Sequence, residues 1–187
     1  MSVQKWSNLE GNAITLFDNT TAGSSGGQHG VAGFANGYRK AATIDDGAPD
    51  IIVNGVVENA NGYTHALMMF NLVAGSSGTT PWASTPNQGG YFAVYFLPTV
   101  DGTTYPTHEV YGNTIYLPNR CHVGSFTVTN GNATTVMPII GAKVPPSSFK
   151  VVIENRSGAA LQPTGGGANQ IGAATAITMK RYTLNTV

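Results

Sequence analysis

The sequence predicts an all-β protein, an antiparallel β-sandwich that is jelly-roll-like and carries long loops or arms rich in Gly, Ser and Thr. Three observations predict this fold. No window of ten or more residues places apolar residues at helical spacing without Gly, Pro or β-branched clusters. Short apolar or alternating segments recur along the chain. The 24 Gly and 10 Pro among 187 residues supply the turns between them.

Alternating segments identify strands whose two faces differ. Residues 149–154 alternate between apolar and charged side chains, which predicts one buried face and one solvated face. Apolar and polar residues also alternate over residues 123–129. Asn130-Gly131 follows with the positive-φ residues of a tight turn, and we expect a returning strand at 133–136 that completes a hairpin.

Two segments, residues 66–70 and 91–97, are continuously apolar. Continuous apolar runs are typical of strands covered on both faces, here on one side by the core and on the other by a partner. We expect these two strands to be central. The remaining strands, for about eight to ten in all, are expected at residues 14–17, 51–57, 114–117 and 175–183. Asn54-Gly55 leaves open whether 51–57 is one strand or two short strands of a hairpin.

A chain of this length fits a single sandwich domain spanning 1–187. Three segments within it are predicted to be flexible arms or loops: 20–33, 75–90 and 162–172, of which the first and the third lack apolar anchors. Such segments gain order when a neighbouring subunit supplies contacts. Trp82 lies in the second segment and either plugs the core of this domain or anchors into a neighbour; its flanks of Gly, Ser, Thr and Pro favour the neighbour. The third segment contains three consecutive glycines, Gly165, Gly166 and Gly167.

Charged residues are scarce. Asp, Glu, Lys and Arg make up 10% of the chain, against roughly a quarter in soluble domains. Residues 59–100 contain none of the four, and similar stretches occupy 19–38, 121–142 and 157–179. A surface with so little charge favours permanent association with neighbours. The composition therefore indicates an assembly component rather than an enzyme.

No residue cluster predicts a catalytic, metal or cofactor site. Three of the nine acidic residues lie together in a segment that predicts a turn: Asp45, Asp46 and Asp50. The histidines show no pair at the spacing of zinc ligands: His29, His65, His108 and His122. Cys121 is the single cysteine, which excludes an internal disulfide and predicts a small buried apolar residue.

Nucleic-acid and membrane partners are not expected. The formal net charge is zero and no basic stripe is present to bind phosphates. The longest apolar runs are shorter than the ~18 residues of a membrane helix, and the N-terminal residues lack the apolar core of a signal peptide. We therefore expect a chain that is not secreted by that route.

Aromatic residues leave a second class of function open. Sugar rings stack on exposed aromatic side chains, and Trp82 and Tyr105 are the two that core formation explains least. Four more tyrosines could contribute, although core formation explains them equally well: Tyr91, Tyr95, Tyr111 and Tyr116. A glycan is therefore a possible partner.

Residues 144–161 read VPPSSFKVVIENRSGAAL and residues 177–182 read ITMKRY. Together they resemble the C-terminal strand pair of small β-sandwich virion proteins of tailed bacteriophages. The resemblance implies a capsid decoration (cement) protein or another virion surface subunit, commonly a homotrimer, made in the host cytoplasm and bound to the major capsid protein or another virion protein. Contacts are expected at Trp82, Tyr105 and Gly165, Gly166 and Gly167. The alternative is a receptor- or glycan-binding domain of a tail fibre or other attachment structure.

Overall fold

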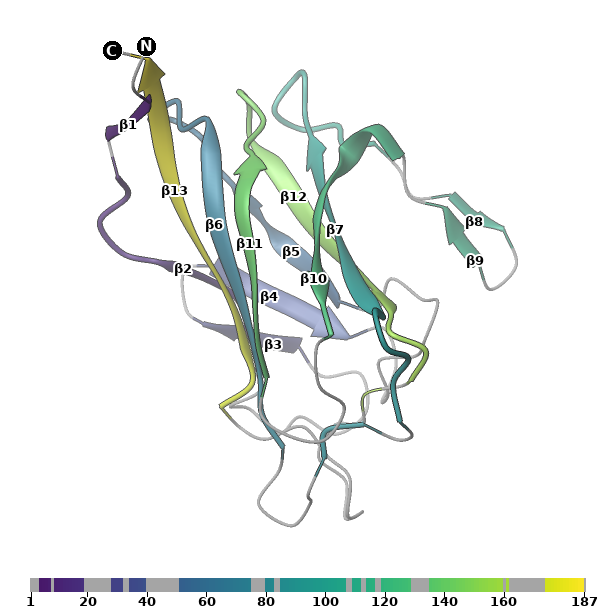
Figure 1. The fold of residues 1–187 in the computed structure, drawn as a ribbon. Helices are drawn as coiled ribbons and strands as arrows, with labels where there is room; N and C mark the ends of the chain where they lie inside the picture. The colour runs from purple at the N-terminus through teal and green to yellow at the C-terminus, as the bar shows by residue number, and fades with distance from the viewer. Residues whose placement is uncertain are drawn as a thin grey trace.

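The strands form two antiparallel sheets that pack against each other, as Figure 1 shows for the computed structural model of the chain. The structure describes residues 4–7, 9–18, 28–31, 34–39, 51–74, 80–82, 85–106, 109–111, 114–116, 119–128, 135–159, 161 and 174–186. Within these ranges there is no α-helix, and the helical residues are a 3-10 turn, η1 (Asn119–Cys121). No helix in the described part is long and apolar enough to cross a membrane. The predicted all-β sandwich-like fold is confirmed.

The first sheet has the strand order β1-β13-β6-β11, and β2 also pairs with β13. Its strands are β1 (Gln4–Ser7), β2 (Ile14–Asp18), β6 (His65–Leu72), β11 (Thr135–Lys143) and β13 (Ala176–Thr186). In this sheet β6 is central, as its apolar run predicts, whereas β11 is an edge strand.

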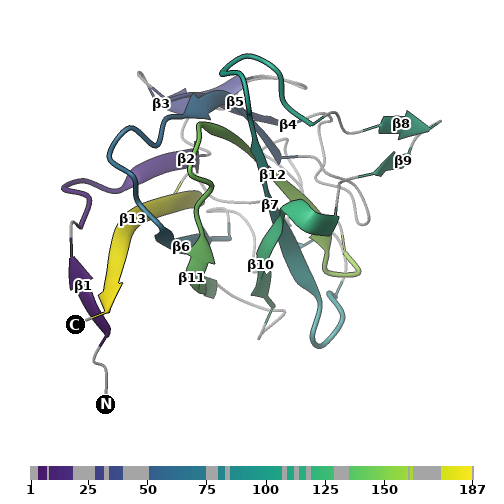
Figure 2. The same ribbon diagram turned by 90° about the horizontal axis from the view of Figure 1, so that it is seen from above.

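The second sheet has the order β10-β7-β12-β5-β4-β3. Its strands are β3 (Gln28–Val31), β4 (Phe34–Arg39), β5 (Ile51–Val57), β7 (Tyr91–Pro98), β10 (His122–Thr127) and β12 (Phe149–Arg156). A separate two-stranded sheet, β8 (Glu109–Tyr111) with β9 (Thr114–Tyr116), projects from the sandwich (Figures 1 and 2).

One buried apolar cluster fills the space between the two sheets. Phe70 of the first sheet meets Phe92 of the second edge to face, with ring centroids 5.0 Å apart, and meets Phe126 at 5.6 Å. Such edge-to-face pairs add stability beyond the burial of their area. The aromatic residues of the apolar runs therefore hold the two sheets together.

The sheets also approach each other along their edges. β10 and β11 lie side by side where the sheets meet (Figure 2), and β2 lies against β3 and β4. Gly124 of β10 permits the closest approach, since a Cβ built there would lie 2.8 Å from Cγ2 of Ile139 on β11. A side chain at position 124 would displace the Ile139 side chain.

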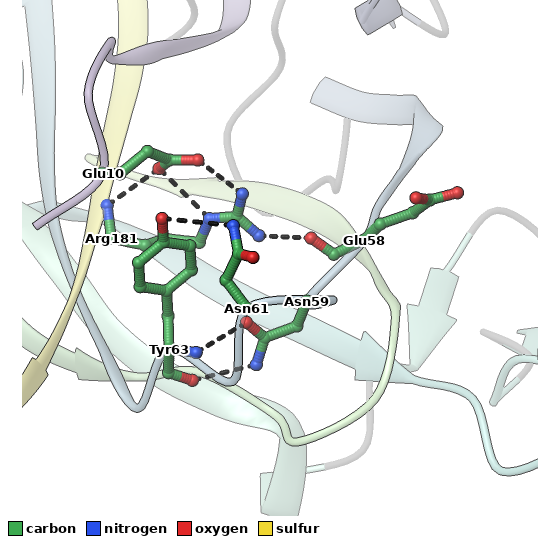
Figure 3. Close-up of polar contacts among 6 residues, drawn as sticks. All are labelled: Glu10, Glu58, Asn59, Asn61, Tyr63 and Arg181. Atoms are coloured by element: carbon green, nitrogen blue, oxygen red, sulfur yellow. Dashed lines mark hydrogen bonds and ion pairs between the residues drawn. The ribbon is translucent and has the colours of Figure 1, made fainter. Parts of the chain in front are cut away.

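A buried ion pair fastens the segment before β2 to β13 (Figure 3). Arg181 donates through Nε to Glu10 Oε2 at 3.1 Å and through Nη2 to Glu10 Oε1, while Nη1 donates to the carbonyl oxygen of Glu58 at 2.5 Å. The guanidinium also lies 4.9 Å from the ring centroid of Tyr63. Arg181 thus joins three segments that are distant in sequence.

The hairpin predicted from residues 123–129 and 133–136 is wrong. β10 pairs with β7, and β11 pairs with β6, so the two strands belong to different sheets. Alternation and an Asn-Gly pair predict a chain reversal, but they do not determine which strand receives the hydrogen bonds. The long apolar strands β6 and β7 take those partners instead.

The solvated face predicted for residues 149–154 is wrong at Glu154, which is buried, whereas Lys150 on the same face is half-buried. Val152 and Glu154 on that face are 2% and 3% exposed. A small apolar cluster covers Val152, and Cys121 belongs to it, as its predicted burial requires.

Two further segments differ in detail from the expectations. Residues 51–57 form one strand rather than a hairpin, and its register against β12 is irregular between Val53 and Val57, where Asn54-Gly55 lies. Strand β3 lies within the segment 20–33 that was expected to be an arm or loop. The two segments that carry the virion-protein resemblance, β12 and β13, lie in opposite sheets and do not pair.

Candidate interaction surface

On the outer face of the first sheet, β6 and β11 carry an uncovered apolar patch, and Thr178 and Lys180 of β13 lie beside it. Side chains alternate along β11, which directs Val136, Pro138 and Ile140 away from the core. Val136 is 52% exposed and Ile140 is 75% exposed, and Met69 on neighbouring β6 is 41% exposed. Val, Ile and Met are among the residue types that are most often buried.

The strand register gathers these side chains into one patch. Pro138 lies opposite Met69, and Ile140 lies opposite Leu67. We call the set Leu67, Met69, Val136, Pro138 and Ile140 the apolar face. The continuous run at 66–70 predicts a strand whose outer side is covered by a partner, and the residues of that side, Leu67 and Met69, belong to this face.

A β-bulge in β11 sets the limit of the apolar face. The register against β6 shifts between Ile140 and Ala142, and Gly141 between them has a φ of 76°. Glycine adopts this left-handed conformation without steric cost. The bulge keeps Ile140 outward and turns Ala142 inward, so the next outward residue is Lys143.

Pro138 also influences how β11 can associate. β11 is an edge strand, and its Pro138 has no N–H to donate to an added strand. Edge-to-edge pairing with another chain is therefore interrupted at this residue. Contact through the side chains of the apolar face remains open.

A second candidate site lies on the outer face of the second sheet. A cavity of about 330 Å³ is lined by Tyr91, Ala93, Tyr95, His122 and Ser125, and we call it the tyrosine cavity. The ring of His122 meets Tyr95 edge to face at 5.4 Å, and its Nε2 lies 3.1 Å from Ser125 Oγ. Tyr91 is 40% exposed.

A buried carboxylate holds one tyrosine of this cavity in place. The Tyr95 hydroxyl donates to Glu154 Oε2 at 3.2 Å, and Arg156 Nη2 pairs with Glu154 Oε1 at 2.7 Å. Burial, together with the neighbouring Glu154 charge, raises the pKa of Tyr95 to about 12. The cavity therefore combines a hydrogen-bonded phenol, Tyr95, with the exposed Tyr91 and small polar groups.

The structure places Trp82 in the core of its own sandwich. Trp82 is 1% exposed, its ring stacks on Phe92 with centroids 5.9 Å apart, and its backbone bridges to Leu161. This corrects the preference for a neighbour contact at Trp82. Its small polar flanks let the segment turn inward, and burial of the large ring stabilises that turn.

Tyr105 lies in neither the apolar face nor the tyrosine cavity. It is half-buried, Lys150 Nζ lies 4.6 Å from its ring centroid, and its buried hydroxyl has no hydrogen-bond partner in the described part of the chain. The expected contact at Tyr105 stays a prediction. The three glycines expected at contacts lie outside the described residues: Gly165, Gly166 and Gly167.

Candidate metal ligands do not come together where the structure describes them. No group of three or more His, Cys, Asp or Glu residues could hold a metal ion within the described ranges. Four residues considered in the sequence lie outside those ranges: Asp45, Asp46, Asp50 and His108. His29 lies in β3.

Comparison of the chain with protein-family models, with curated proteins and with solved structures finds no match. The structure itself therefore defines the class: a two-sheet antiparallel β-protein with an uncovered apolar face on one sheet and a tyrosine-lined cavity on the other.

Proposed function

We propose that this chain is a structural component of a virion, a capsid decoration protein that binds and stabilises the outer surface of a tailed-bacteriophage head. The observation that carries the proposal is the apolar face, where Met69, Val136 and Ile140 are all exposed in a single chain. Contiguous exposed apolar side chains mark interaction surfaces. The low charge content and the resemblance of residues 144–161 and 177–182 to virion proteins support the virion as the assembly.

The apolar face would act by removing apolar area from water. Each Å² of apolar area buried contributes about 25 cal/mol before the costs of association are subtracted. Contact between these faces would hold a symmetric homotrimer together, and the three linked copies would bind a shell far more tightly than one copy alone. Modest contacts per chain are then sufficient for stable decoration.

The test is co-sedimentation of the purified chain with a panel of undecorated tailed-phage heads. Ile140→Lys places a charge in the apolar face and is expected to abolish co-sedimentation. Val56→Lys is the matched control, because Val56 is 38% exposed on β5 of the other sheet. Equal binding by wild type and Ile140→Lys, or binding to none of the heads, would count against decoration through this face.

A second candidate function is glycan binding by a phage attachment structure, and the tyrosine cavity favours it. Tyr91 offers an exposed ring for stacking, and Ser125, His122 and Tyr95 offer polar atoms around it. On a glycan array, binding that is lost in Tyr91→Ala, kept in Tyr91→Phe and kept in Ile140→Lys would support this function over decoration.

A further inference from the structure

A larger cavity, of about 730 Å³, opens at the end of the sandwich where β7 ends and β10 begins. We call it the end cavity. Its apolar walls come from the second sheet and from the segment after β11: Phe96, Pro98, Val123, Val144 and Pro145. Gly141 and Lys143 of β11 in the first sheet complete the lining. Phe96 belongs to the buried core, whereas Val100 at the same cavity is fully exposed. The cavity therefore lies between the buried core at Phe96 and solvent at Val100.

The charged residues that line the end cavity are all basic. Arg120 and Lys143 are exposed. His122, which is also exposed, lines the same cavity. No Asp or Glu is found among the described lining residues. In a chain with nine basic and nine acidic residues, two of the basic ones at this single opening favour an anionic group there.

We propose that the end cavity binds an alkyl carboxylate of the fatty-acid type. The alkyl chain lies against Phe96, Val123 and Val144, and the carboxylate lies at the opening, where Arg120 and Lys143 donate to it. The volume is in the range of small-molecule sites, which are apolar with a few polar groups that orient the ligand. Arg and Lys bind carboxylates through charge-assisted hydrogen bonds.

The proposal is independent of capsid decoration. The apolar face lies on the outside of the first sheet, whereas the end cavity is lined by residues of both sheets, including Phe96 from the core. The two sites meet only near the β11 bulge, where Gly141 and Lys143 line the cavity. Either function can therefore fail without the other.

The test is isothermal titration calorimetry of the full chain with decanoate and with 1-decanol, which share an alkyl chain and differ in charge. Decanoate is expected to bind about tenfold more tightly than decanol. Arg120→Gln/Lys143→Gln is expected to remove this difference while decanol binding stays unchanged. Lys180→Gln on β13, which does not line the cavity, is the matched control.

A second pair of variants keeps the test decisive. Val100 is fully exposed, so replacing it leaves the core intact. Val100→Glu is expected to weaken decanoate binding about tenfold by charge repulsion, and Val100→Gln is expected to leave it within about twofold. Absence of decanoate binding, equal affinity for decanoate and decanol, or binding that is lost in Ile140→Lys instead would overturn the proposal.

Discussion

Replacing Arg181 with Met is expected to lower the free energy of unfolding by about 3 kcal/mol, because it leaves the carboxylate of Glu10 buried without its charged partner. Arg181 is 6% exposed, and the side chain of Glu10 is 14% exposed. The substitution removes two side-chain hydrogen bonds to Glu10 and one to the carbonyl of Glu58. The backbone N–H of residue 181 still donates to the Glu10 carboxylate at 3.0 Å.

The value of 3 kcal/mol is smaller than the sum of three charged hydrogen bonds, each worth about 1.5–3 kcal/mol. Met keeps the apolar stem of the side chain in place, and the three bonds do not contribute additively. For a chain of this length the same loss lowers the melting temperature by roughly 6–12 °C.

Urea unfolding of wild type, Glu10→Gln, Arg181→Met and the double variant measures the interaction. The double variant is expected to be less destabilised than the sum of the two single variants by at least about 1 kcal/mol. A loss below about 1 kcal/mol in Arg181→Met, or strict additivity of the two substitutions, would refute the assignment of a stabilising buried pair.

Three further predictions concern the core, one tyrosine and the bulge. Trp82→Ala is expected to lower the free energy of unfolding by about 4 kcal/mol in urea unfolding; a loss below about 1 kcal/mol with a reduced solution mass would restore the neighbour-contact interpretation. Because the pKa of Tyr95 is raised from 10.0 to about 12, its stabilising contribution is complete below pH 10 and is lost as the pH rises through 12. Ultraviolet titration should show a late-ionising phenol that Tyr95→Phe removes, and ionisation of all folded-state phenols near pH 10 would contradict this. Gly141→Val is expected to cost about 2 kcal/mol, since its φ of 76° strains a β-branched residue; an unchanged urea midpoint would argue against the bulge.

Local pattern was sufficient to predict most strands. The continuous run at 91–97 is β7, which is buried on both faces as its composition indicates. Cys121 is buried, as was expected of the single cysteine. These features depend on the period and polarity of nearby residues, which a single sequence contains.

Pairing between distant strands could not be predicted in the same way. β10 and β11 are neighbours in the chain, yet they do not pair with each other. β10 pairs with the apolar strand β7, and β11 pairs with the apolar strand β6. Glu154 is charged and still buried, since Tyr95 and Arg156 supply its hydrogen bonds. Neither arrangement leaves a local signal.

The interaction surface was predicted only in part. The run at 66–70 pointed to a partner on the outer side of β6, where Met69 is exposed. The contribution of β11 was missed, although Val136, Pro138 and Ile140 alternate in the sequence. A proline such as Pro138 argues against a strand in the sequence. The sheet order shows that β11 is an edge strand, where a proline is tolerated.

The most direct test of the central claim, that the apolar face is an association surface, is the solution mass measured by light scattering with size exclusion over a wide dilution range. We predict that the wild type and Val56→Lys form a trimer that persists on dilution, and that Ile140→Lys elutes as a folded monomer. A wild type that is monomeric throughout, or an Ile140→Lys variant that keeps the trimer mass, would contradict the claim.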